Sequence, residues 1–458
     1  MSFRNCVIFN GVLLLLGVCH KPIGAVEQSP VSLPFASGVV LKYSGTLVPE
    51  EASTGTGKNF EVLFLSLSPD ADKQHILAYV VREQGQGAWL WPERFGTVTL
   101  NGTFQRSDGG SGPALLYELE KRPHPVVLPL PAFSNHRQLV SNAQFEAEKL
   151  GYGVTRQRTL RDRKVWEVEV TGRFGFKSLL WIDQAKPLLV GTDERLFMGT
   201  GIEFQMTMRL DEVVQLSNEE FDSSRRAFQA LLKLKTALGR PQATPLTMLT
   251  TAQLDQTRES LGDLSERGRQ TIFAPLISEI RRDVRQQTAR EGGLSQLVAN
   301  RVGKPSPAFE LTTLNRRGFK SSQLEGKVTI LHFWDYLGDP LVEPYGQVGY
   351  LDFLYGKRRD EGVQVVGVAV DKRLGTKDRD PLRKIRKLRQ FMNLSYPIAL
   401  DNGKVLESFG DPRVVGAKLP LFVVIGPDGK VTHYHAGFYQ IKVDEGLRQL
   451  DTEINRLQ

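Results

Sequence analysis

The chain has 458 residues, which is too long for one ordinary domain and favours two or three. Hydrophobic residues make up 40% of the sequence and charged residues 24%, a balance that excludes a disordered chain and a bundle of membrane helices. The formal net charge is +8, but the stretch 371–391 holds nine basic and three acidic residues, so the basicity is local.

The first 25 residues predict an export signal. Arg4 precedes an apolar run over 6–19 that is too short to span a bilayer, and a small residue, Ala25, offers a cleavage point. The stretch 16–19 is also a degenerate lipid-attachment motif, so a lipoprotein anchored through Cys19 is the alternative. No later stretch is long and apolar enough for a transmembrane helix, which predicts a periplasmic or extracellular protein.

Cysteine usage adds a second expectation. The chain has two cysteines, Cys6 and Cys19, and both lie in the predicted signal. Cleavage would remove them, and lipidation would block Cys19. We therefore expect the mature protein to contain no reactive thiol and no disulfide.

Residues 26–216 predict a β-rich domain. Alternating β-branched, aromatic and polar residues are typical of half-buried strands, and Gly-rich and Pro-rich stretches separate them. The clearest examples are 60–67, 165–170, 179–183 and 202–210. An antiparallel sheet, curved or sandwiched, is expected. The last strands faintly resemble the half-barrels of lipoprotein carriers, which implies an apolar-ligand carrier as an alternative function.

Residues 217–296 predict a helical connector. Ser217 followed by Glu219 and Glu220 is a helix start, because a capping hydroxyl and early acids satisfy free amides. Apolar residues then recur at helical spacing, at Phe221, Phe228, Leu231, Leu232 and Leu238 and again at Leu261, Leu264, Ile272, Leu276 and Ile280.

Residues 297–458 alternate strands and helices. The expected strands are 328–334, 363–370, 421–425 and 430–435, and the expected helices are about 344–359, 381–392 and a last one bearing Leu447, Leu450, Ile454 and Leu457 on one face. This order predicts a mixed sheet covered by helices.

Four motifs in this region resemble the TlpA/ResA-like and AhpC/TSA redoxins of the thioredoxin superfamily. They are the Gly-Lys-Pro and Pro-Ala-Phe entry at 303–309, the Gly-Lys-Val and His-Phe-Trp strand at 326–334, the Gly-Val-Gln-Val strand at 362–371, and Lys-Leu-Pro before the strand at 421–425. The resemblance covers about 160 residues, from 297 to 458. It implies a thioredoxin-like fold, with a cis peptide bond before Pro420 that faces the active site.

The chemistry of that family resides in two cysteines directly after the first strand. Here 333–341 reads Phe-Trp-Asp-Tyr-Leu-Gly-Asp-Pro-Leu, without cysteine. Since thiolate is the nucleophile in disulfide exchange, the sequence predicts no catalytic residue, no metal site and no cofactor. We expect a non-catalytic binding or scaffolding module of the cell envelope, a pseudoenzyme. The alternative that the resemblance implies is a redoxin-type thiol-disulfide oxidoreductase or antioxidant enzyme.

Without the cysteines, the resemblance still implies a groove that binds a protein or peptide. In redox-active relatives, the loop after the first strand and the cis-proline loop bracket a groove that pairs with substrate backbone. Its walls here would be Trp334, Tyr336, Leu337, Leu341, Leu419 and Pro420. The alternative interpretation is that these side chains only fill the junction between sheet and loop.

The predicted helix at 381–392 has an apolar stripe and a basic remainder. The basic residues are Arg383, Lys384, Arg386, Lys387 and Arg389. A solvated face is one explanation; an anionic partner, such as lipid, polysaccharide or an acidic protein, is the other. Nucleic acid is not expected, because no aromatic residues interleave with the cations.

Three further patterns in the sequence do not predict a functional site. His433 and His435 share a strand face but lack a complete ligand set, even with His332 in another strand, so no metal site is predicted. The stretch 55–58 resembles a phosphate loop, but Asn59 follows its lysine and a strand follows the loop, so it is interpreted as an ordinary loop. Trp89 and Trp91 are expected in the core or at its rim.

Overall fold

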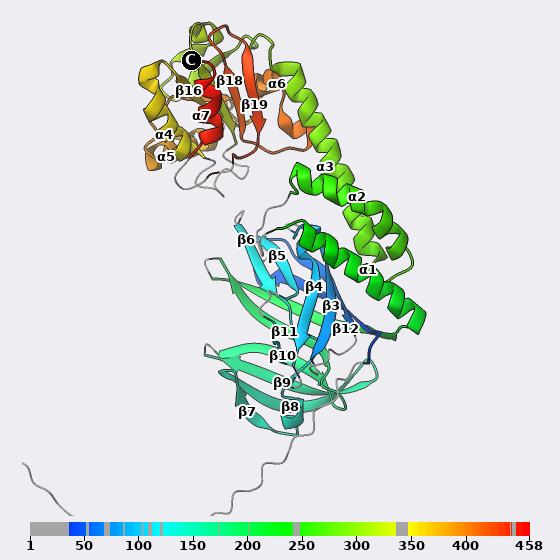
Figure 1. The fold of residues 1–458 in the computed structure, drawn as a ribbon. Coiled ribbons are helices and arrows are strands. Elements are labelled where there is room, and N and C mark those ends of the chain that lie inside the picture. The colour runs from blue at the N-terminus through cyan, green and yellow to red at the C-terminus, as the bar shows by residue number, and fades with distance from the viewer. Residues whose placement is uncertain are drawn as a thin grey trace, which may run out of the picture.

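The computed structural model describes residues 36–458 except for 52–54, 68–73, 86–87, 102, 104, 109–111, 120–121, 174, 200, 241–247, 336–346, 440 and 442–445. The predicted signal with Cys6 and Cys19 lies outside the described residues. Three parts follow one another along the chain: an antiparallel sheet, three helices, and a mixed α/β domain (Figure 1). This arrangement confirms the predicted fold class.

The N-terminal domain is built on a ten-stranded antiparallel sheet with the order β4-β3-β2-β1-β12-β11-β10-β9-β8-β7. Its strands are β1 (Val39–Pro49), β2 (Lys58–Ser66), β3 (His75–Gln84), β4 (Phe95–Leu100), β7 (Gln144–Ala147), β8 (Leu150–Leu160), β9 (Arg163–Gly172), β10 (Gly175–Asp183), β11 (Leu189–Met198) and β12 (Ile202–Gln215). A hairpin of β5 (Ala114–Leu119) and β6 (Arg122–Val127) packs on one face, where the Tyr117 and Phe204 rings lie 4.8 Å apart.

The opposite face of this sheet is covered by helices α1 (Asn218–Ala237), α2 (Thr251–Gly268) and α3 (Ala274–Arg301). Ser217 and Glu220 form the capping box that the sequence predicts at the start of α1. Phe228 on α1 and Phe273 before α3 stack with their centroids 5.1 Å apart, in the same cluster as Val40 of β1. Apolar side chains on alternate residues of the strands therefore serve two cores, one on each side of the sheet.

Helix α3 belongs to two cores. Its first half contributes Ile280 to the cluster over the N-terminal sheet, whereas near its end Leu297 packs into the core of the C-terminal domain. Figure 1 shows the helix running from one domain to the other. A Cβ added to Gly293 would lie 2.7 Å from a methyl carbon of Val415, so the absence of a side chain allows the C-terminal domain to approach.

The C-terminal domain has a seven-stranded sheet with the order β14-β13-β17-β16-β15-β18-β19. Strands β15, β16 and β17 are parallel, and β18 is antiparallel to β15. The strands are β13 (Glu310–Thr313), β14 (Gly318–Lys320), β15 (Thr329–Trp334), β16 (Gln364–Val370), β17 (Ile398–Asp401), β18 (Leu421–Ile425) and β19 (Val431–Ala436). The helices are α4 (Val348–Arg358), α5 (Asp380–Phe391), α6 (Lys404–Phe409) and α7 (Arg448–Asn455).

Helices α4, α5 and α7 cover one face of this sheet, and α6 with the end of α3 covers the other. The elements predicted after residue 328 are present within a few residues of their expected bounds. The hairpin β13–β14, strand β17 and helix α6 were not predicted, because segments of three to six residues are too short to display a period.

Candidate functional site

The carboxyl ends of the parallel strands form one edge of the C-terminal sheet. Asp335 and Asp371 directly follow β15 and β16, and Asp401 ends β17. Strand β18 runs the opposite way, so its start lies at the same edge, where the Leu419–Pro420 peptide bond is cis as the resemblance implies. We call this region, with Arg413, the carboxyl edge. In open α/β sheets this edge is the usual place for ligands.

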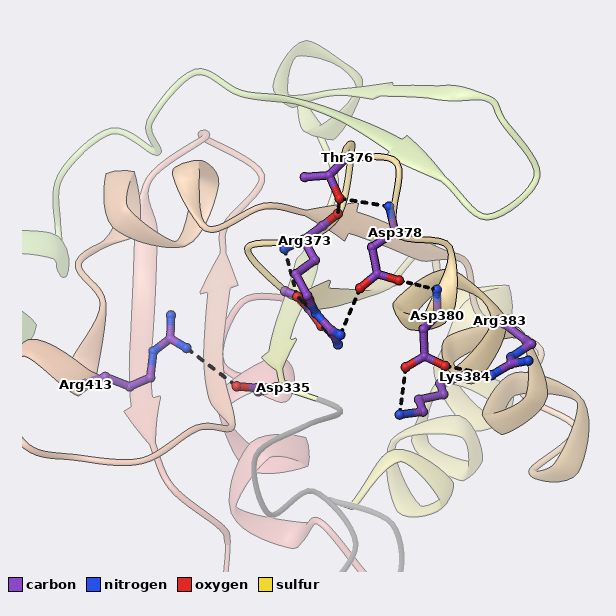
Figure 2. A network of polar contacts seen from close by, with 9 residues as sticks. Asp335, Arg373, Thr376, Asp378, Asp380, Arg383, Lys384 and Arg413 are labelled. Carbon is purple, nitrogen blue, oxygen red and sulfur yellow. Dashed lines mark hydrogen bonds and ion pairs between the residues drawn. The ribbon is translucent and has the colours of Figure 1, made fainter.

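Arg413 connects two acids at the carboxyl edge. It lies in the turn before β18, donates to both carboxylate oxygens of Asp411, and places Nη1 3.7 Å from Oδ2 of Asp335. The Asp411 carboxylate raises the pKa of the Arg413 guanidinium, which is therefore a permanent cation. Figure 2 shows Arg413 reaching toward Asp335. A fixed positive charge thus stands beside the first residue after β15.

A second group of charges follows β16. Arg373 is held by Asp371, with an Nη2–Oδ2 distance of 3.0 Å, and by Asp378 at 3.0 Å from Nη1 (Figure 2). Asp401 accepts backbone amides at the start of α6, including that of Leu406 at 2.9 Å. Each strand end therefore carries a carboxylate with a cation or backbone amides beside it, and the edge is polar.

The predicted groove residues do not share one environment. Trp334 is 2% exposed and belongs to the core, so its ring packs under the edge. Leu419 is partly buried, and Pro420 is buried with its carbonyl accepting the Gly437 amide at 2.7 Å. Tyr336, Leu337 and Leu341 lie outside the described residues.

The predicted basic residues all lie on α5, but their partners differ. Asp380 pairs with Arg383 and Lys384, each at 2.8 Å, and these partners lower the pKa of its carboxyl (Figure 2). Arg389 donates to the Asn315 amide oxygen at 3.2 Å. Arg386 and Lys387 are exposed, and no ion pair to either is present among the described residues.

The three histidines of the sequence analysis line up across β15, β18 and β19. His332 is paired through Phe422 with His435, and His433 lies two residues before His435 on the same strand. The His332 and Phe422 rings stack at 4.4 Å. Within the described residues, no group of three His, Cys, Asp or Glu side chains is arranged to hold a metal ion.

Of the remaining patterns, Lys58 begins β2 and is buried against Glu83 with an Nζ–Oε2 distance of 2.8 Å, so the stretch 55–58 ends in a structural ion pair. Trp89 and Trp91 are buried. Sequence reasoning missed Arg413 and Asp411, because nothing local links a surface arginine to a strand end some 80 residues earlier. Asp335, directly after a buried strand, was the one available signal.

Comparison with known proteins agrees with this architecture. Residues 302–434 match the model of the AhpC/TSA family, so the C-terminal domain is an AhpC/TSA-type redoxin domain with a thioredoxin-like fold. Thiol-disulfide oxidoreductase ResA from Bacillus thuringiensis (strain Al Hakam) is 27% identical over 154 residues, 33% of this chain and 78% of ResA. ResA from Halalkalibacterium halodurans is 25% identical over 138 residues, 30% of this chain and 69% of that protein.

Among solved structures, a putative protein disulfide isomerase from Bacteroides thetaiotaomicron aligns with 34% of this chain and 89% of its own, at 21% identity and a TM-score of 0.28. The matched segment 302–434 of this chain contains no cysteine. None of the helices within the described ranges has both the length and the apolar character that a membrane span requires.

Proposed function

We propose that the C-terminal domain binds an extended segment of a partner protein at its carboxyl edge, without thiol chemistry. The observation that supports this proposal is the residue that follows β15. Redoxins carry cysteine after this strand, whereas here Asp335 follows it and faces the Arg413 cation. From residue 20 onward the chain has no cysteine, and no other side chain performs disulfide exchange.

The carboxyl edge offers what an extended peptide needs. The Nη1–Oδ2 distance of 3.7 Å between Arg413 and Asp335 is longer than a hydrogen bond, so Nη1 has N–H groups to give to a peptide carbonyl. The Arg413 side chain is 35% exposed and within reach from solvent. The backbone at Leu419 leads into β18 at the same edge of the sheet, and strand-like pairing with such backbone is a common mode of peptide recognition.

A peptide selection tests the proposal. Displayed random 12-residue peptides are selected on the full chain, and the dissociation constants of the enriched sequences are measured for Arg413→Glu and Arg456→Glu. Both arginines pair with a nearby acid, but Arg456 lies beyond α7. We expect Arg413→Glu to weaken binding at least tenfold and Arg456→Glu to change it less than twofold. Equal loss in both variants would place the binding surface elsewhere.

The thiol-free part of the proposal has its own assay. The chain from residue 26 is mixed with dithiothreitol and either insulin or hydrogen peroxide, and turnover is compared with buffer. We expect no turnover above the buffer rate. Turnover above the buffer rate would restore the oxidoreductase alternative.

We also propose that the protein acts in the cell envelope, which rests on the signal-like first 25 residues. The intact mass of the protein from an envelope fraction distinguishes the alternatives. A chain beginning near Val26 supports cleavage, a modified Cys19 supports a lipid anchor, and a chain retaining free Cys6 and Cys19 contradicts both.

A further inference from the structure

One side of α5 carries cations on successive turns. Arg379, Arg383, Arg386 and Lys387, together called the basic face, lie opposite the buried residues Ile385 and Leu388. Their side chains line an open depression of about 600 Å³. Because residues three and four apart on a helix are neighbours, the four cations form one continuous surface.

The basic face is costly for folding. Like charges at spacings of three and four residues repel, and cations in the first turn oppose the helix dipole. The one acid of α5, Asp380, engages Arg383 and Lys384 and leaves the others. In the described part of the chain, Arg379, Arg386 and Lys387 have no ion-pair partner. Residues that oppose local stability in this way are expected where a ligand compensates for them.

The cations of α3 show what a balanced helix looks like. Arg281, Arg282 and Arg285 are exposed there and also lack an ion pair among the described residues, but α3 as a whole carries three acids for five basic residues. Helix α5 has one acid for six basic residues if its capping residue Arg379 is counted. The excess charge is therefore a property of this surface and not of the helices in general.

Two exposed aromatic side chains lie on the same pair of helices. Phe391 at the end of α5 is 68% exposed, and Phe353 on α4 is 75% exposed. The helices are adjacent, since a Cβ added to Gly349 of α4 would lie 3.2 Å from the terminal methyl of Met392 (Figure 1). Exposed phenyl rings beside cations suit the boundary between lipid headgroups and acyl chains, whereas a soluble polyanion gives such rings no apolar environment.

We propose that the basic face of α5, together with Phe391 at the end of α5 and Phe353 on the adjacent helix α4, binds the phosphate-bearing surface of an anionic lipid bilayer. Guanidinium groups match phosphate oxygens in pairs, and three of the four cations are arginines. The attraction acts through a rigid helix whose apolar side is fixed in the core, so binding requires no refolding of α5. This surface is independent of the peptide site proposed above.

The test measures partition of the full chain onto vesicles by flotation. Phosphatidylcholine vesicles are compared with vesicles in which roughly a third of the lipid is phosphatidylglycerol. We expect binding to the anionic vesicles only. The triple variant Arg379→Gln, Arg386→Gln, Lys387→Gln should bind on the order of 100-fold more weakly, at about fivefold for each cation near an anionic surface. High salt should reduce the binding of the native chain.

A matched variant separates a site from a net-charge effect. The triple variant Arg281→Gln, Arg282→Gln, Arg285→Gln removes the same charge from α3. It should change partition less than about threefold, far less than the loss expected for the α5 variant. Phe391→Ser should weaken binding severalfold without changing the salt dependence. Equal losses in the two triple variants would overturn the proposal. So would absence of vesicle binding while heparin still binds and loses affinity only in the α5 variant, because that result indicates a soluble polyanion.

Discussion

The two domains bury a titratable side chain in opposite ways. In the N-terminal domain, Lys58 and Glu83 form an ion pair whose side chains are 1% and 0% exposed. Lys58 also donates to the Leu116 carbonyl, and Glu83 accepts the Leu116 and Trp89 amides. In the C-terminal domain, His332 is fully buried, and neither ring nitrogen has a hydrogen-bond partner among the described residues.

Burial of a titratable side chain therefore has two costs, which appear under different conditions. A paired charge costs stability when one partner is removed, because the other is then stranded without water. An unpaired neutral base costs stability when it must take up a proton. The Lys58–Glu83 pair joins β2, β3 and β5, so it also specifies where the β5–β6 hairpin rests. His332 specifies no pairing, and its burial is useful only while the ring stays neutral.

The largest expected effect comes from breaking the ion pair. Glu83→Ala should destabilise the N-terminal domain by about 3–5 kcal/mol, because Lys58 would remain buried and charged. Hydrogen exchange of peptides from β2, measured across a urea series, reports this change locally. The double variant Lys58→Met, Glu83→Leu is the control and should recover only the part of the loss that comes from the stranded charge, because the Leu116 and Trp89 backbone groups still lose their partners. A loss below about 1 kcal/mol for Glu83→Ala would mean that the pair is solvated.

The second effect concerns pH. Burial lowers the pKa of His332 to about 3, against 6.5 for a free histidine, so between these values the unfolded chain binds more protons than the folded one. Stability therefore falls as pH falls below 6.5, by up to about 1.4 kcal/mol for each pH unit. Burial lowers the pKa of His433 and His435 as well, which adds loss of the same sign.

Urea unfolding of the C-terminal domain at pH 7 and pH 4.5 tests this linkage. His332→Phe should reduce the loss of stability between the two pH values by roughly 2–3 kcal/mol, because its stacked position over Phe422 can be kept without a titrating ring. Glu83→Ala should leave that pH dependence in place. If stability varied with pH in the same way in the native chain and in His332→Phe, the protonated His332 ring would have to be stabilised by a hydrogen-bond acceptor in the folded protein.

A third pair of variants asks how firmly α3 ties the two regions together. Gly293→Ala places a methyl group against Val415 and should cost about 1–3 kcal/mol through overpacking. Gly292→Ala meets no atom within 4 Å and should stabilise by about 1 kcal/mol, as expected for glycine inside a helix. Thermal melting of both proteins gives the comparison. If both substitutions stabilise the protein, Val415 can shift to accommodate the added methyl group at little cost.

The smallest effect lies on α5. Arg386→Gln relieves repulsion with Arg383 and should raise the free energy of unfolding by about 0.3 kcal/mol. Arg456→Gln, which removes an arginine paired with Glu453, should lower it by a similar amount. Repeated urea titrations resolve the sign. A clear loss for Arg386→Gln would give this residue a structural role and weaken the case for a ligand.

How far the sequence predicts this molecule depends on whether the signal is local. The long strands, the capped start of α1 and the redoxin order are predicted because periodicity and capping act over neighbouring residues. The Lys58–Glu83 pair is not predictable, since its members stand 25 positions apart and only the fold brings them together. The same reason hides Arg413 from sequence analysis. Trp334 was expected as a groove wall, and its 2% exposure arises because helices cover both faces of the sheet at β15, whose residues are all buried.

The sharing of α3 has a mechanical consequence. Its 28 residues span about 42 Å at 1.5 Å per residue, and its two ends are embedded in different cores. Because the helix is rigid, a small tilt of its first half, where Ile280 is buried, produces a larger displacement at Leu297. Cutting the chain at the predicted boundary of 297 would divide α3 within its last turns. A redoxin domain excised in this way would lose the part of α3 that packs beside its carboxyl edge.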